Sequence, residues 1–120
     1  MPAVILRFYG YKKCATCRKA EKHLEARKIP YAFTDITEKP PEAAELGRLI
    51  KISGRPLSAF YNTSGELYKS MKIKDRRVRL TDAEQIALLA AHGRLLKRPL
   101  LVGDKRVTVG FGPEEAATWV

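Results

Sequence analysis

Cysteine and histidine are scarce in this chain, and long apolar runs are missing. Its 120 residues include two cysteines, Cys14 and Cys17, and two histidines, His23 and His92. A zinc site needs four ligands at suitable spacing, and these residues do not supply that pattern. No apolar run approaches the roughly 20 residues of a membrane helix, and the N-terminus lacks a signal-peptide pattern. We therefore expect a cytoplasmic protein with no metal site, no bound cofactor and no membrane contact.

Acidic residues are also in short supply. There are 13 Asp and Glu against 23 Lys and Arg, which gives a formal net charge of +10. Such a charge favours anionic partners, for example glutathione, oxyanions, acidic protein surfaces or nucleic acid. A nucleic-acid reader also needs a recognition motif, and none is present. The densest basic stretch, residues 72–79, is predicted to be a solvated loop, so no direct nucleic-acid contact is expected.

The sequence contains no internal repeat, low-complexity tract or linker. A chain of 120 residues is long enough for one domain with a core and too short for two ordinary ones. Hydrophobic residues make up 45% of it, a proportion that excludes wholesale disorder. We expect a single domain over residues 1–120, present as a monomer.

The N-terminal pattern predicts a strand, a helix and a second strand. Residues 4–9 are almost continuously apolar, which indicates a buried central strand. A helix is predicted from about Cys17 to Lys28, because the residue before Pro30 is disfavoured in a helix. A second strand follows at residues 31–36. This order indicates a βαβ unit with parallel strands.

A helical insertion and a hairpin complete the predicted α/β fold. The insertion covers about residues 38–93 and includes a capping box formed by Thr81 and Glu84. Its last helix should stop at Gly93 in a left-handed C′ conformation, near His92. The other predicted helical segments are residues 42–53, 57–61 and 66–71. An antiparallel hairpin is predicted at residues 100–109, with a terminal helix from Gly112.

The segment Cys14-Ala15-Thr16-Cys17 carries the chemistry. It follows a strand and a short loop and opens a helix, and a helix N-terminus stabilises the reactive thiolate. Lys12, Lys13 and Arg18 add positive charge around it. Cys14 is the predicted nucleophile, and Cys17 lies one turn further on, where it could attack a mixed disulfide on Cys14. The alternatives are two small apolar helix residues or half of a zinc site. His23 is predicted to be a surface residue.

Four stretches together resemble the arsenate reductase/Spx-like family over nearly the whole chain. They are residues 14–20, 60–65, 96–100 and 109–111. The resemblance implies a thioredoxin-like fold, with a mixed four-stranded sheet and a helical subdomain between its halves. It also implies that Cys14 is the redox thiol, that Pro99 is cis beside it, and that Arg98 holds an anion through its planar fork.

These inferences define the predicted site and its departures from the family. The predicted catalytic residues are Cys14, Cys17 and Arg98, and the predicted substrate-binding residues are Lys13, Ala15, Arg18 and Pro99. Arsenate reductases of this family use two further arginines. The matching neighbourhoods in this chain are residues 60–62 (Phe-Tyr-Asn) and 110–112 (Gly-Phe-Gly), and neither contains an arginine. Arg55 is near the first of these neighbourhoods in sequence, but it is not aligned to the position of the family's arginine. The reductases also typically lack a cysteine at the position of Cys17.

Two functions follow from the resemblance. The first is a thiol-dependent oxidoreductase of the arsenate reductase-like type, with glutathione or thioredoxin as the reductant and Cys17 as a resolving thiol. The second is an Spx-type redox-sensing regulator that binds the RNA polymerase α subunit through a Cys14–Cys17 switch. Gly54 falls near the position at which such regulators contact the polymerase.

Overall fold

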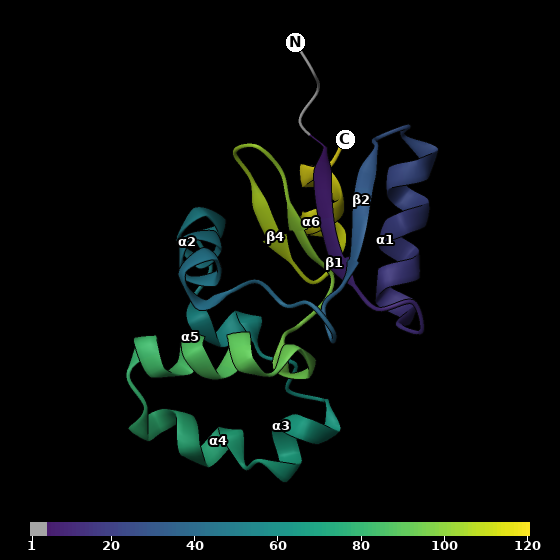
Figure 1. Ribbon diagram of the computed structural model, residues 1–120. Helices are drawn as coiled ribbons and strands as arrows, with labels where there is room; N and C mark the ends of the chain where they lie inside the picture. Colours follow the sequence, from purple (N-terminus) through teal and green to yellow (C-terminus); the bar gives the residue numbers. More distant parts are fainter. Residues whose placement is uncertain (1–4) are drawn as a thin grey trace.

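A computed structural model of the chain describes residues 5–120 (Figure 1). Val4, the first residue of the first predicted strand, lies outside this range. The strands are β1 (Leu6–Gly10), β2 (Tyr31–Asp35), β3 (Leu100–Val102) and β4 (Val107–Val109). The α-helices are α1 (Ala15–Ala26), α2 (Ala43–Ser53), α3 (Glu66–Ser70), α4 (Ile73–Arg76), α5 (Asp82–Ala91) and α6 (Pro113–Thr118). Three short 3₁₀ turns, η1 (Leu57–Phe60), η2 (Arg77–Arg79) and η3 (Gly93–Leu95), join them.

The four strands form one mixed sheet in the order β2-β1-β3-β4. β1 is parallel to β2 and antiparallel to β3, and β3 is antiparallel to β4. β1 therefore lies inside the sheet, where both of its faces are covered, and its apolar run is explained by that position. The predicted α/β class, the parallel βαβ unit and the C-terminal hairpin are confirmed.

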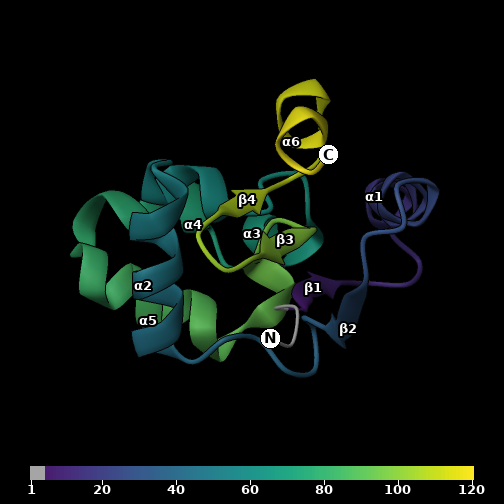
Figure 2. The ribbon, with the colours of Figure 1, turned by 90° about the horizontal axis from the view of Figure 1, so that it is seen from above.

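Helices cover both faces of the sheet, as Figure 2 shows from above. Because successive strand residues point to opposite faces, neighbours on one strand enter different cores. Phe8 and Leu101 pack with Cys17 and other residues of α1 and with Trp119, which follows α6. Tyr9 and Leu100 pack with the segment between β2 and β3.

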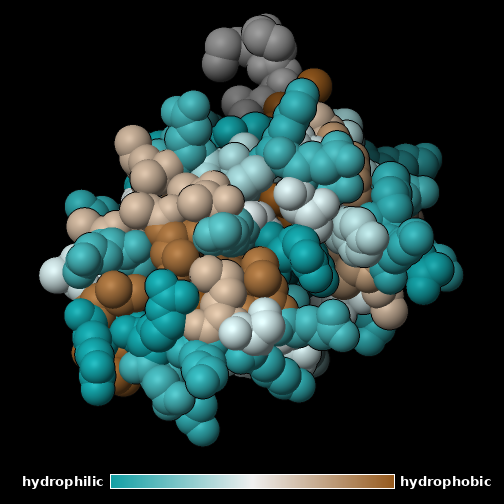
Figure 3. Space-filling model, turned by 60° about the horizontal axis from the view of Figure 1, so that its bottom comes forward, coloured by the Kyte–Doolittle hydropathy of each residue, from teal (hydrophilic) through white to brown (hydrophobic). Residues whose placement is uncertain are grey.

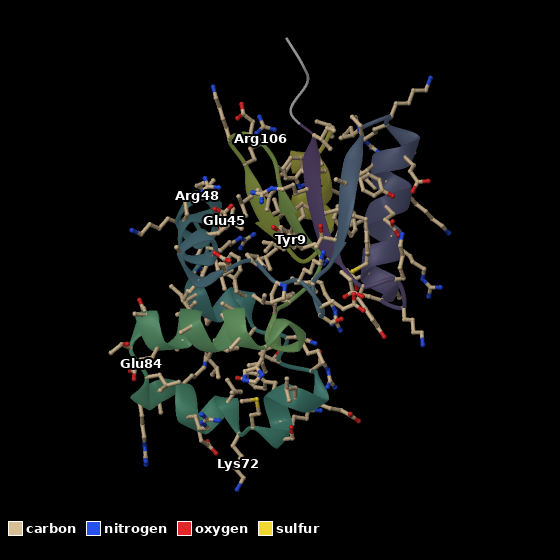
Figure 4. All side chains as sticks on the ribbon, viewed as in Figure 1. Tyr9, Glu45, Arg48, Lys72, Glu84 and Arg106 are labelled. Carbon is tan, nitrogen blue, oxygen red and sulfur yellow. The ribbon has the colours of Figure 1, made fainter. Side chains whose placement is uncertain are left out.

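The α2 helix is fixed to the sheet by a small charged network (Figure 4). Glu45 on α2 accepts hydrogen bonds from Arg7 of β1 at 2.9 Å and from Arg48 at 2.7 Å. Arg7 also donates to the hydroxyl of Tyr9. These two arginines lower the pKa of Glu45 to about 2, Arg48 through the larger effect. The network therefore ties the helical segment to the central strand.

Residues 72–79 are exposed at most positions, as predicted, but the predicted loop is wrong, because residues 73–79 form α4 and η2. Ile73 is fully buried and anchors α4, while the guanidinium of Arg77 lies 5.6 Å from the ring centroid of Tyr61. Most of the basic side chains of residues 72–79 therefore belong to α4 and η2, and Lys72, just before α4, points away from the molecule (Figure 4). Hydrophilic side chains cover much of the face seen in Figure 3.

The end of α5 also differs from the prediction. The capping box is confirmed, since Glu84 N–H donates to the hydroxyl of Thr81 and Thr81 N–H donates to the Glu84 carboxylate. Gly93, however, is not in the left-handed region. It is buried, and a Cβ on it would lie 1.9 Å from the carbonyl oxygen of Ile36. A close approach of two backbone segments, rather than a helix cap, requires this glycine.

Within residues 5–120, none of the helices has the length and apolar character needed to cross a membrane.

Candidate active site

Cys14 is the N-cap of α1. Its backbone N–H donates to the carbonyl of Tyr11 at 3.0 Å, which closes the loop after β1. Its Sγ accepts the backbone N–H of Cys17 at 3.4 Å. The helix begins at Ala15, two residues before the predicted start, because the Cys14 sulfur caps its first turn. The sulfur therefore occupies the position where a helix N-terminus stabilises negative charge most strongly.

The surroundings of Cys14 favour its thiolate. Partial burial acts to raise the pKa of this thiol, but the hydrogen bonds from Cys17, the charge of Arg98 and the backbone N–H of Thr16 outweigh it. The net effect is a pKa below the ordinary value for cysteine. The thiolate is the nucleophilic form. Cys14 is also half-buried rather than enclosed, so a substrate in the adjoining pocket can reach it.

Cys17 has the opposite environment. Its side chain is fully buried and packs with Phe8, Ala20 and Leu24 in the core beneath α1. Burial and the neighbouring Cys14 raise the pKa of Cys17 to about 12. Among residues 5–120, no polar or charged side chain is buried with it. The two cysteines therefore differ in both access and ionisation.

A pocket of about 500 Å³ opens beside Cys14. Four parts of the chain line it: the start of α1, the segment from the end of α2 to α3, the turn before β3, and the segment from β4 to α6. Its charged lining residues are Arg55, Lys97, Arg98 and Glu115. With three cations against one carboxylate, the lining carries an excess of positive charge, although Arg55 is paired with Glu114 and Glu115.

Arg98 lines the same pocket as Cys14, and its charge lowers the pKa of that thiol. Its guanidinium stands 5.3 Å from the ring centroid of Tyr11 in the loop that leads to Cys14. The peptide bond between Arg98 and Pro99 is cis, as the resemblance implied, and Pro99 is buried. Arg98 thus joins Cys14 on the pocket wall.

The other predicted substrate-binding residues are less central. Lys13, Ala15 and Arg18 are exposed around the start of α1 and are not among the residues that line the pocket. Lys12 pairs with Glu21 at 3.1 Å and lies 4.1 Å from the ring centroid of Phe33. The positive charge that lowers the pKa of Cys14 comes from Arg98 instead of the lysines beside the motif.

His23, which we predicted to be a surface residue, is half-buried and makes two specific contacts. Its Nε2 lies 2.7 Å from the carbonyl oxygen of Trp119, and its ring contacts Phe111 edge-on at 5.2 Å. It therefore helps to hold the C-terminal segment against α1. Across residues 5–120, no cluster of three or more His, Cys, Asp or Glu side chains could bind a metal ion.

The pocket also contains residues that the sequence reasoning did not assign to it. Arg55 and Lys97 supply two of its three cations, whereas Asn62 and Gly110, from the neighbourhoods of the absent family arginines, are neutral. The helix break at Gly54-Arg55-Pro56 is a sequence signal that places Arg55 just outside α2. Which pocket it reaches depends on the tertiary fold.

Comparison with known proteins shows which proteins the chain is similar to. The chain is 43% identical over 110 residues to the uncharacterized protein YusI of Bacillus subtilis (strain 168), which covers 92% of this chain and 93% of YusI. It is 24% identical over 111 residues to the global transcriptional regulator Spx of the same organism, with 92% and 83% covered.

A solved structure of a possible arsenate reductase from Streptococcus mutans UA159 superposes with a TM-score of 0.83. The two proteins are 38% identical, and the match covers 90% of this chain and 92% of that chain. The model of the ArsC family matches residues 9–119, a range that includes the whole pocket. With the predicted thioredoxin-like fold confirmed, the chain belongs to the ArsC family.

Proposed function

We propose that this protein is a thiol-dependent oxidoreductase that reduces glutathionyl mixed disulfides, with Cys14 as the nucleophile and glutathione as the reductant. The observation that carries the proposal is a thiol with a lowered pKa, placed at a helix N-terminus and open to a cationic pocket. A lowered pKa at pocket-lining cysteines is a general property of reactive thiols.

The reaction has two exchange steps. The Cys14 thiolate attacks the glutathionyl sulfur of a disulfide R–S–S–G, the sulfur–sulfur bond breaks, and R–S⁻ leaves and takes a proton from water. A second glutathione thiolate then attacks the glutathionyl sulfur of the Cys14 adduct. This step releases oxidised glutathione and restores the Cys14 thiolate. One glutathione thiol is oxidised for each R–SH formed, because the net reaction converts R–S–S–G and glutathione into R–SH and oxidised glutathione, so the electrons balance.

The size and charge of the pocket favour a glutathionyl group over arsenate alone. A volume of about 500 Å³ is in the range of sites that bind small organic ligands. A compact oxyanion would fill little of this space, and of the three pocket cations only Arg98 is paired electrostatically with Cys14. The neutral Asn62 and Gly110 also leave an oxyanion with few charged partners.

Steady-state turnover tests the proposal directly. Purified protein is supplied with the mixed disulfide of glutathione and 2-mercaptoethanol, with glutathione, and with a glutathione reductase system that reports oxidised glutathione. We expect turnover that is lost in Cys14→Ser and kept in Lys19→Ala, a change of an exposed residue on α1 that leaves the thiol in place. Turnover that survives in Cys14→Ser would exclude the mechanism. An arsenate-dependent reaction in place of the disulfide reaction would exclude the substrate.

A second function, an Spx-type regulator, is favoured by the surface around the end of α2. Gly54 is exposed with φ +70°, a Cβ on it would contact nothing within 4 Å, and Ile52 beside it is 40% exposed. An exposed glycine lets a partner approach the backbone closely. Co-purification with the RNA polymerase α subunit, tested in the presence and absence of diamide, examines this alternative. No complex in either redox state would remove it.

A further inference from the structure

Arg55 connects the helical segment to the C-terminal helix across the wall of the active-site pocket. It follows Gly54, whose left-handed conformation ends α2 and turns the chain toward α6. Its Nη2 donates to Glu114 at 2.7 Å and to Glu115 at 3.3 Å. Arg55 and Glu115 line the same pocket as Cys14, although they are far from it in sequence.

The two glutamates differ in how firmly they are held. Glu115 is 15% exposed, and its Oε1 accepts the backbone N–H of Gly112 at 2.7 Å, which caps α6. Glu114 is 80% exposed, and its contact with Arg55 is the only side-chain hydrogen bond of its carboxylate within residues 5–120. An exposed pair of this kind contributes little to stability. Glu114 is therefore the partner that a competing carboxylate can displace.

We propose that Arg55 is a second anion-binding residue of the pocket, which takes a carboxylate of the glutathionyl group in exchange for Glu114. This inference rests on the proposed function. Glu115 stays in place and positions the guanidinium, while Glu114 competes with the substrate. Arg55 thus determines specificity, and Glu114 weakens the binding of anionic substrates.

The chemistry of the ligand fits this arrangement. The carboxylates of a glutathionyl group lie at the two ends of the tripeptide, away from its sulfur. Arg98 is beside Cys14, where the sulfur must lie, so a carboxylate needs a cation elsewhere in the pocket. The Arg55 hydrogen bonds within residues 5–120 leave Nε and Nη1 of its guanidinium without a partner. An arginine with unused donors is well suited to a carboxylate.

Two variants separate this role from a structural one, because they should change activity in opposite directions. Arg55→Ala is expected to lower kcat/KM for the glutathionyl disulfide about tenfold, mainly through KM, the size expected for one charge-assisted hydrogen bond. Glu114→Gln is expected to raise kcat/KM about two- to threefold, because the competing charge is removed. Neither should change the reduction of bis(2-hydroxyethyl) disulfide with dithiothreitol as the reductant. Arg27→Ala, an exposed charge at the far end of α1, is the matched control.

The outcomes distinguish the inference from the proposed function. If Arg55→Ala and Glu114→Gln lower activity together, or if the uncharged disulfide is affected equally, the ion pair is structural and the inference is overturned. If the wild type shows no turnover at all, the proposed function fails. The inference is then read from the extent of Cys14 glutathionylation by oxidised glutathione, measured by intact mass. The order Glu114→Gln above wild type above Arg55→Ala supports it, and equal extents or no adduct overturn it.

Discussion

Replacing Cys17 with alanine tests which thiol resolves the Cys14 adduct. A pKa of about 12 leaves a fraction of roughly 10⁻⁵ of Cys17 ionised at pH 7. A free thiol with a pKa of about 8.5 is roughly 3% ionised, on the order of 10³ times more. The part of this shift that comes from Cys14 is lost once Cys14 has formed its adduct, so the fraction rises then, but burial, the largest cause of the raised pKa, remains. Proximity favours Cys17, and we predict that its low ionisation and the burial of its sulfur outweigh that advantage.

We therefore expect Cys17→Ala to keep kcat/KM within about threefold of the wild type when glutathione is the reductant, whereas Cys14→Ala loses about 10³-fold or more. The assay is the coupled turnover of the glutathionyl disulfide, with the intact mass of the enzyme recorded during turnover. A wild-type enzyme that accumulates no adduct, together with a Cys17→Ala enzyme that accumulates one and slows more than tenfold, would refute the reasoning. That result would make Cys17 the resolving thiol.

Three further changes test the electrostatics and the packing around the site. Arg98→Ala removes the cation that lowers the pKa of Cys14, so iodoacetamide alkylation at pH 6 should slow several-fold, and Arg98→Lys should restore most of the rate. The folded-state pKa of Glu45 is about 2, below its ordinary 4.5, so its contribution is present above pH 4.5 and lost as the pH falls toward 2. Glu45→Gln should lower the free energy of unfolding by about 1–2 kcal/mol at pH 7, after discounting for solvent screening, and much less at pH 2.5 in urea titrations. Gly93→Ala should cost about 3 kcal/mol or more, because its Cβ would overlap the carbonyl of Ile36, while Gly47→Ala, with 3.7 Å to its nearest neighbour, should be neutral or stabilising.

Local sequence signals predicted most of the fold. The continuous apolar run of β1 indicated a strand covered on both faces, and Thr81 with Glu84 marked the start of α5. These features depend on neighbouring residues, which a sequence displays directly. The stretch 72–79 was misassigned because its many charges obscured the single buried anchor, Ile73. Gly93 was misassigned because its requirement comes from Ile36, which is distant in sequence.

The part of the site that lies within the motif of residues 14–17 was predictable from the sequence. The strand–loop–helix context of Cys14 indicated a thiol at a helix N-terminus, and the structure places Cys14 there, with Cys17 behind it in the core. We expected Lys12 to add positive charge around Cys14, but Lys12 is paired with Glu21, and the charge that lowers the pKa of Cys14 is that of Arg98. Arg55 reaches the pocket through tertiary structure alone. Its role follows from contacts with α6 that a single sequence does not reveal.

The ionisation of Cys14 is the claim on which the mechanism depends. Its pKa can be measured from the pH dependence of thiolate absorbance in the ultraviolet, with iodoacetamide alkylation rates and peptide mass assigning the signal to Cys14 or Cys17. We predict that Cys14 titrates below the value of an ordinary cysteine thiol, about 8.5, and that Cys17 does not titrate in the neutral range. A Cys14 pKa at or above that value would contradict the account.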